Sequence, residues 1–121
     1  MKCILLTGVA LALSLSVANA DPMSGMYGNT LKMTGADGKS STVYVNQDMS
    51  WEQHMADAST IKGTWMWQDA TTACFTQTDP APKPDMKPYC TVINPHNAGD
   101  SWDAKDAQGK VMMSYSLSAG R

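Results

Sequence analysis

The chain has 121 residues, of which 43% are hydrophobic and 17% charged, and its formal net charge is −2 at pH 7. This length predicts one small domain. The sequence has no basic stretch that could neutralise a run of phosphates and no basic amphipathic helix. We therefore do not expect nucleic acid or a membrane surface as a partner.

The first 20 residues have the three parts of a cleavable export signal. Lys2 supplies the basic start, residues 4–17 form an apolar run, and the small residues Ala18-Asn19-Ala20 precede Asp21. The apolar run is shorter than the roughly 20 residues of a membrane-spanning helix. We expect cleavage after Ala20 and a soluble mature chain in the periplasm or the extracellular medium, with no stable membrane insertion.

The segment that cleavage would expose, residues 21–28, is rich in Gly, Pro and Ser and has no hydrophobic period. Such a composition is typical of a flexible terminal arm. We expect the folded domain to begin at Asn29 and to extend to residue 121.

From Asn29 onward the sequence alternates between apolar and polar residues, which is the pattern of half-buried strands. Leu31 and Met33 begin the alternation, and the Asp37-Gly38 pair suits the tight turn of a hairpin. A loop with four prolines over residues 78–88 interrupts the later strands. In chain order, the expected strands cover residues 29–34, 42–46, 49–55, 61–67, the region of 74–75, 89–93, 101–105 and 111–117.

These segments make about eight short strands with mostly tight connections. Residues 51–58 contain enough helix formers to make a helix the rival interpretation there. The regular spacing predicts an all-β domain, a small antiparallel up-and-down meander that closes into a barrel, because closure removes exposed strand edges. A barrel of this size is filled by its own side chains or holds at most one small ligand.

Two cysteines remain after cleavage, Cys74 and Cys90. An even number of cysteines in an oxidising compartment predicts a disulfide. Redox and metal sites usually use closer spacings such as C-x-x-C. The bond would join the two strands that the proline-rich loop separates.

The sequence contains no G-x-S-x-G, H-E-x-x-H or P-loop motif. Its two histidines are far apart, with His54 expected on the solvent face of a strand and His96 in a turn. We therefore expect a binding module rather than an enzyme.

Methionine is frequent, with ten in the chain against one phenylalanine. One explanation is that methionine fills irregular core space. The other is a Cu(I) site, since thioethers are soft ligands, and in its residue types the chain resembles small periplasmic copper carriers with a β-barrel fold. Strand alternation places His54 opposite Met49 and Met55, which favours the packing explanation. The candidate copper ligands are Met23, Met26, Met49, Trp51, His54 and Met55.

Gly63-Thr64-Trp65 resembles the G-x-W strand of lipocalins, avidin-like barrels and small periplasmic inhibitors of secreted metalloproteases. Cys74, Cys90 and Gly99-Asp100-Ser101-Trp102 follow in an order similar to those inhibitors, and to small exported proteobacterial β-barrel proteins of mostly unknown function. The resemblance covers about residues 61–117 and implies a lipocalin-like barrel. In those families the G-x-W strand opens the barrel, whereas three expected strands precede it here.

These observations leave three hypotheses. The resemblance to the inhibitors implies a protein-binding module that blocks a secreted hydrolase, with the start of the arm, Asp21, Pro22, Met23 and Ser24, entering the cleft. The methionines suggest a periplasmic Cu(I) carrier, and the other two hypotheses require no cofactor. The third hypothesis is a barrel that holds a small apolar ligand between Trp65, Trp67 and Trp102.

Overall fold

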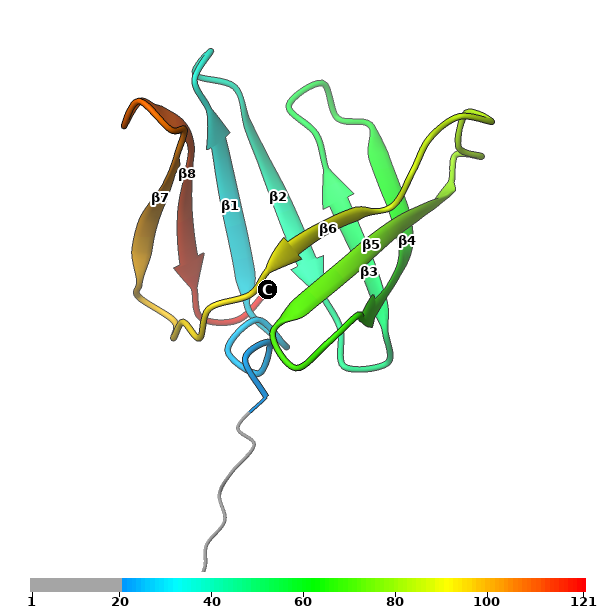
Figure 1. Ribbon diagram of the computed structural model, residues 1–121, viewed down its shortest axis with the longest axis horizontal. Helices are drawn as coiled ribbons and strands as arrows, with labels where there is room; N and C mark the ends of the chain where they lie inside the picture. Colours follow the sequence, from blue (N-terminus) through cyan, green and yellow to red (C-terminus); the bar gives the residue numbers. More distant parts are fainter. Residues whose placement is uncertain (1–20) are drawn as a thin grey trace, which may run out of the picture.

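Eight antiparallel strands form one sheet in the order β6-β5-β4-β3-β2-β1-β8-β7 (Figure 1). The computed structural model describes residues 21–121, so the expected export signal lies outside the described part. No helix in the described residues is long and apolar enough to cross a membrane. The strands are β1 (Thr30–Gly35), β2 (Ser40–Val45), β3 (Ser50–His54), β4 (Thr60–Trp67), β5 (Thr72–Asp79), β6 (Tyr89–Val92), β7 (Ser101–Lys105) and β8 (Val111–Ser118).

The predicted all-β, up-and-down antiparallel fold is confirmed, and the rival helix over residues 51–58 is not formed. The sheet curls into a half-barrel whose two ends are β6 and β7 (Figure 1). No Cα atom of β6 lies within 8 Å of one in β7, whereas hydrogen-bonded strands lie about 4.8 Å apart. The half-barrel therefore has an open side between these two strands, and residues 93–100 connect them at one end.

An aspartate organises each of the five tight hairpin turns, which are all the hairpin connections except the proline-rich loop between β5 and β6. The carboxylates of Asp37, Asp48, Asp57, Asp69 and Asp106 each accept a hydrogen bond from the backbone N–H two residues further on. These side-chain bonds add to the backbone hydrogen bonds within the same turns. The even spacing of the strands follows from these short, internally bonded turns.

The core lies at one end of the half-barrel, which we call the closed end. Its centre is Trp65, which is 2% exposed and whose indole N–H donates to the carbonyl of Asn46 at 3.0 Å. The hydrogen bond satisfies the polar atom of a side chain that is otherwise apolar. The buried residues of the core are Met23, Met26, Leu31, Val43, Val45, Trp65, Ala73, Ile93 and Leu117.

Residues 21–28 are part of this core, so the prediction of a flexible arm is wrong. Met23 is 1% exposed and Met26 is 8% exposed, and Tyr27 forms a parallel bridge with Val45. Backbone hydrogen bonds three residues apart wind the segment into consecutive turns, which bring the two methionines to the same side. The apolar surface that they remove from water holds the segment in place. We call residues 21–28 the N-terminal plug.

The predicted disulfide between Cys74 and Cys90 is present. The two residues are direct partners across β5 and β6, with Cα atoms 4.0 Å apart. The strand β6 has four residues and pairs with β5 alone. The bond therefore fixes the strand that borders the open side.

Replacing both cysteines by serine should lower the free energy of unfolding by about 3 kcal/mol, because the unfolded chain regains the freedom of the loop that the disulfide closes. Urea unfolding of the oxidised wild type and of the double variant measures the difference. A reducing agent should bring the wild type to the stability of the variant and leave the variant unchanged. Equal stability of the oxidised protein and the variant would contradict the prediction.

The turn aspartates should lower the free energy of unfolding as the pH falls into the acid range. Hydrogen bonds lower the pKa of Asp48 and Asp57, chiefly from the hydroxyl of the serine two residues further on, and that of Asp69, chiefly from the amide of Thr71. Since the folded pKa lies below the unfolded value of about 3.9, this stability is complete above that value and is lost as the pH falls through the folded pKa.

The measurement is urea unfolding at about pH 5 and about pH 2.5, on either side of the unfolded pKa. A variant with asparagine at positions 48, 57 and 69 is the matched control, because asparagine keeps the side-chain acceptor of the turn and does not titrate. We expect the variant to lose less stability than the wild type over this range. The same loss in both proteins would show that other groups control acid stability.

Candidate functional site

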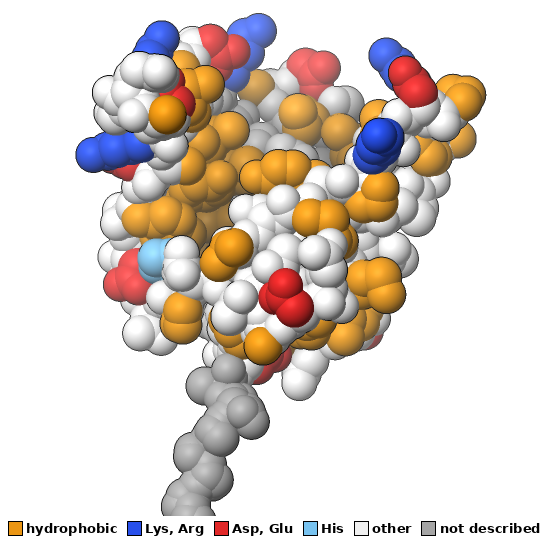
Figure 2. All heavy atoms as spheres, in the orientation of Figure 1, with side chains coloured by type: hydrophobic (Ala, Val, Ile, Leu, Met, Phe, Trp, Pro, Cys, Tyr) orange, Lys and Arg blue, Asp and Glu red, His pale blue; other side chains and the backbone are white. Residues whose placement is uncertain are grey.

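The concave face of the half-barrel contains a cavity of about 560 Å³. Residues of β5 and β6 line one wall, residues of β7 and β8 line the other, and β1, β2 and β3 form the back. Met23 and Met26 of the N-terminal plug close the cavity towards the core. The space-filling view shows the cavity as a hollow lined mainly by hydrophobic side chains (Figure 2).

Three parallel rings form one wall of the cavity, and we call them the aromatic stack. Trp102 lies with its ring centroid 3.4 Å from that of His96, at an interplanar angle of 3°. On the neighbouring strand its direct partner Tyr115 is also near-parallel, with a centroid distance of 5.4 Å. The imidazole of His96 lies 3.7 Å from the carboxylate of Asp100. The loop between β6 and β7 is therefore held against β7 through ring contacts.

The opposite wall carries Phe75 and Tyr89, which are direct partners across β5 and β6. Behind them the ring of Trp51 meets Phe75 edge to face, at a centroid distance of 6.3 Å. The Trp51 indole N–H donates to the carbonyl of Thr64 at 2.9 Å, which positions its ring over Gly63. A Cβ at Gly63 would lie 2.7 Å from that ring. The glycine of the G-T-W motif thus makes room for a cavity-lining tryptophan.

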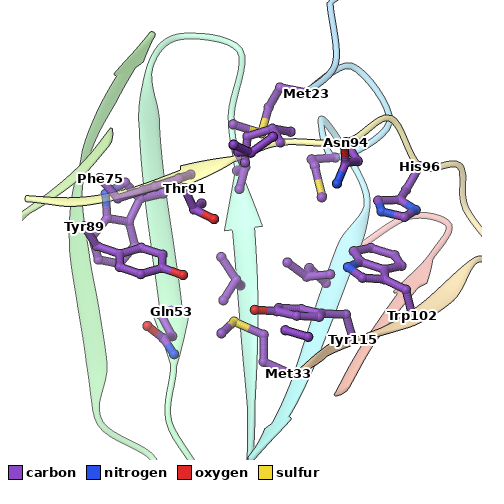
Figure 3. Close-up of a pocket in the computed structure, with 18 of the residues that line it drawn as sticks. Met23, Met33, Gln53, Phe75, Tyr89, Thr91, Asn94, His96, Trp102 and Tyr115 are labelled. Carbon is purple, nitrogen blue, oxygen red and sulfur yellow. The ribbon is translucent and has the colours of Figure 1, made fainter. Parts of the chain in front are cut away.

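Several polar side chains point into the cavity. The hydroxyl groups of Tyr89 and Tyr115 extend towards each other from opposite walls, and Thr91 and Asn94 lie nearer the plug (Figure 3). Tyr89 is 63% exposed, so it lies at the mouth of the cavity. Burial, together with the nearby Tyr89, raises the pKa of Tyr115. Its phenol therefore remains protonated at neutral pH and can donate a hydrogen bond.

The three tryptophans expected to hold a ligand do not lie together. Trp102 lines the cavity. Trp65 is buried in the core at the closed end, and Trp67 meets it edge to face at a centroid distance of 5.6 Å, away from the cavity lining. The expectation of a pocket between these three rings is therefore corrected. Strand alternation identifies the inward face, but the core occupies one end of that face.

The six methionine, histidine and tryptophan residues considered as copper ligands do not converge. Trp51 points into the cavity, whereas His54 lies on the outer face of β3, where it hydrogen-bonds to Glu52 and packs against Tyr44. Met49 precedes β3 and is 43% exposed. The remaining candidates are Met55, which follows β3 at its other end, and Met23 and Met26, which pack in the core. Among residues 21–121, no group of three or more His, Cys, Asp or Glu side chains could hold a metal ion.

The arm residues proposed to enter a protease cleft are also held by the fold. Met23 is in the core, and the carboxylate of Asp21 accepts hydrogen bonds from the Met23 amide and the Tyr27 hydroxyl. Burial and this carboxylate raise the pKa of Tyr27. Of the four residues, Ser24 is exposed and Pro22 is partly buried.

Sequence reasoning missed the aromatic stack because it placed His96 in a solvent-exposed turn. In the structure the turn covers residues 97–100, where the Asp100 amide donates to the Asn97 carbonyl, and His96 precedes this turn. The N-terminal plug packs against His96, since a Cβ at Gly25 would overlap with the His96 backbone carbonyl. It also missed Phe75, Tyr89 and Tyr115 as cavity residues. The sequence placed these three residues in strands, but it could not show that a cavity lies beside their side chains.

No protein-family model, curated protein sequence or solved structure that we compared with the chain matches it. The site is therefore interpreted from its own geometry.

Replacing Gly25 by alanine should displace the loop that carries His96, because the added methyl group overlaps with backbone atoms that cannot rotate away. We expect a loss of about 1–3 kcal/mol in the free energy of unfolding and a changed fluorescence of Trp102. Ser24→Ala is the control, because Ser24 is exposed next to the same glycine. A Gly25→Ala variant with wild-type stability and fluorescence would refute this packing.

Proposed function

We propose that the protein is an exported binding module that holds a small apolar ligand in the half-barrel cavity. The observation that carries this proposal is the cavity itself, which measures about 560 Å³ and has a mainly apolar lining that includes aromatic and methionine side chains. Ligand sites typically have volumes of roughly 300–1,000 Å³ and combine an apolar lining with a few polar groups. The cavity has both properties.

The walls of the cavity are supported independently of any ligand. The disulfide holds β6 on β5, and the N-terminal plug closes the floor with Met23 and Met26. The aromatic stack holds the loop of residues 93–100 against β7. A preorganised site loses less conformational entropy when the ligand binds.

The disulfide also supports the exported location in the proposal. Disulfides persist in oxidising environments such as the periplasm or the extracellular medium. The bond between Cys74 and Cys90 is compatible with such a compartment, which is where the predicted signal would deliver the chain.

The other two hypotheses have less support. An inhibitor that inserts its N-terminal arm would have to withdraw Met23 and Met26 from the core, where they are 1% and 8% exposed. Each buried methionine contributes about 1.5–3 kcal/mol through the hydrophobic effect. A copper carrier would need Trp51 and His54 on one side of β3, and they lie on opposite faces.

The test is an NMR titration of the oxidised protein with two neutral probes of different shape, 2-naphthol and 1-octanol. At least one probe should shift the amide signals of β6 and β7, because these strands border the cavity. Ala104→Trp should abolish the shifts by filling the space, since Ala104 lines the cavity.

Ser101→Trp provides the matched control, because it adds the same side chain to an exposed position of the same strand. This variant should bind as the wild type does. If neither probe shifts the amides of cavity residues, or if Ala104→Trp binds as well as Ser101→Trp, the proposed function is wrong.

A further inference from the structure

We infer that the ligand is a planar, uncharged aromatic molecule that carries a hydrogen-bonding group, rather than a flexible hydrocarbon chain. This inference rests on the proposed function and specifies the class of ligand for the same cavity. It depends on three properties of the lining: its aromatic content, its polar groups and its charge.

Aromatic side chains are concentrated at the cavity. The chain has four tryptophans, four tyrosines and one phenylalanine, and more than half of these rings line this one space. They are Trp51, Phe75, Tyr89, Trp102 and Tyr115.

Aromatic rings attract one another in offset-stacked and edge-to-face arrangements, beyond the effect of buried area. The Trp102 ring is held parallel to both His96 and Tyr115, and such a fixed ring loses little freedom when a ligand packs against it. Methionine side chains such as Met33 can adapt to the edge of a planar ligand and make favourable contacts between sulfur and ring. The wall therefore favours a flat, rigid molecule.

The polar groups of the cavity argue against a pure hydrocarbon. The hydroxyl groups of Tyr89 and Tyr115 face each other across the cavity (Figure 3). Thr91 and Asn94 add further polar groups to the lining. A hydrocarbon would remove these groups from water without replacing the hydrogen bonds, which is unfavourable. A ligand with an acceptor or a hydroxyl group between the two tyrosines would satisfy them.

The charges of the lining indicate that the ligand is neutral. The described part of the chain buries no polar or charged residue. Two charged side chains contribute to the lining, Lys87 and Asp103, which have opposite signs and are both exposed. An ionised ligand in the interior would lose its hydration without a buried partner of opposite charge.

The same NMR titration, extended to three probes, tests the inference. The probes are 2-naphthol, naphthalene, which lacks the hydroxyl group, and 1-octanol, which has the hydroxyl group on a flexible chain. We expect 2-naphthol to bind about fivefold tighter than naphthalene, the effect of one hydrogen bond. It should also bind about fivefold tighter than 1-octanol, because it stacks on the rings and has no chain to order.

Tyr89→Phe combined with Tyr115→Phe assigns the hydrogen bond to these residues. The double variant keeps both rings, so it should weaken 2-naphthol about fivefold and leave naphthalene unchanged. Tyr44→Phe is the matched control, because Tyr44 packs against His54 on the outer face and is absent from the cavity lining. It should leave the affinity for all three probes unchanged.

The outcomes separate the inference from the proposed function. Binding of 1-octanol as tight as that of 2-naphthol, with lining amides shifted, would overturn the aromatic ligand and leave the binding cavity intact. Equal affinity for naphthalene and 2-naphthol, or a double variant that binds 2-naphthol as the wild type does, would overturn the role of the two hydroxyl groups. Binding of none of the probes would refute the proposed function together with the inference.

Discussion

Burial of the Trp65 indole at the closed end is the interaction on which the half-barrel depends. Its ring contacts Tyr27 of the plug, Trp67 and Phe75, and its N–H is satisfied by the carbonyl of Asn46. An indole of this size removes about 200 Å² from water, which stabilises the fold by on the order of 4 kcal/mol. One side chain thereby joins β4, the turn between β2 and β3, and the N-terminal plug.

This concentration of the core explains why the rest of the concave face can stay hollow. The closed end supplies the buried surface that a small domain needs, with Met23 and Leu117 both 1% exposed. The disulfide then holds β6, which pairs with one neighbour only. Along the other edge, β7 carries Asp103 and Lys105, and charged residues on an edge strand discourage pairing with other chains. The open side is thus protected at both of its edges, and it gives access to the cavity.

The strands were predictable because their signals are local. Leu31, Val43 and Val45 alternate with polar neighbours, and all three are buried as the alternation requires. The disulfide followed from the count of cysteines, without any knowledge of the register that makes Cys74 and Cys90 direct partners. The candidate site was less predictable. Alternation places Trp65 and Trp102 on the concave face alike, and it contains no information on which part of that face is packed and which part is empty.

The sequence by itself determined the eight strands, their tight aspartate turns and the covalent link between β5 and β6, because each depends on residues within one or two adjacent elements. Only the tertiary structure decided that residues 21–28 plug the closed end, that His96 stacks on Trp102, and that β6 and β7 stay apart. These features depend on contacts between segments far apart in the chain, such as Gly25 with His96 and Tyr27 with Trp65. Periodicity cannot reveal such contacts, since the free energy of packing depends on the shape of the space that the other strands leave.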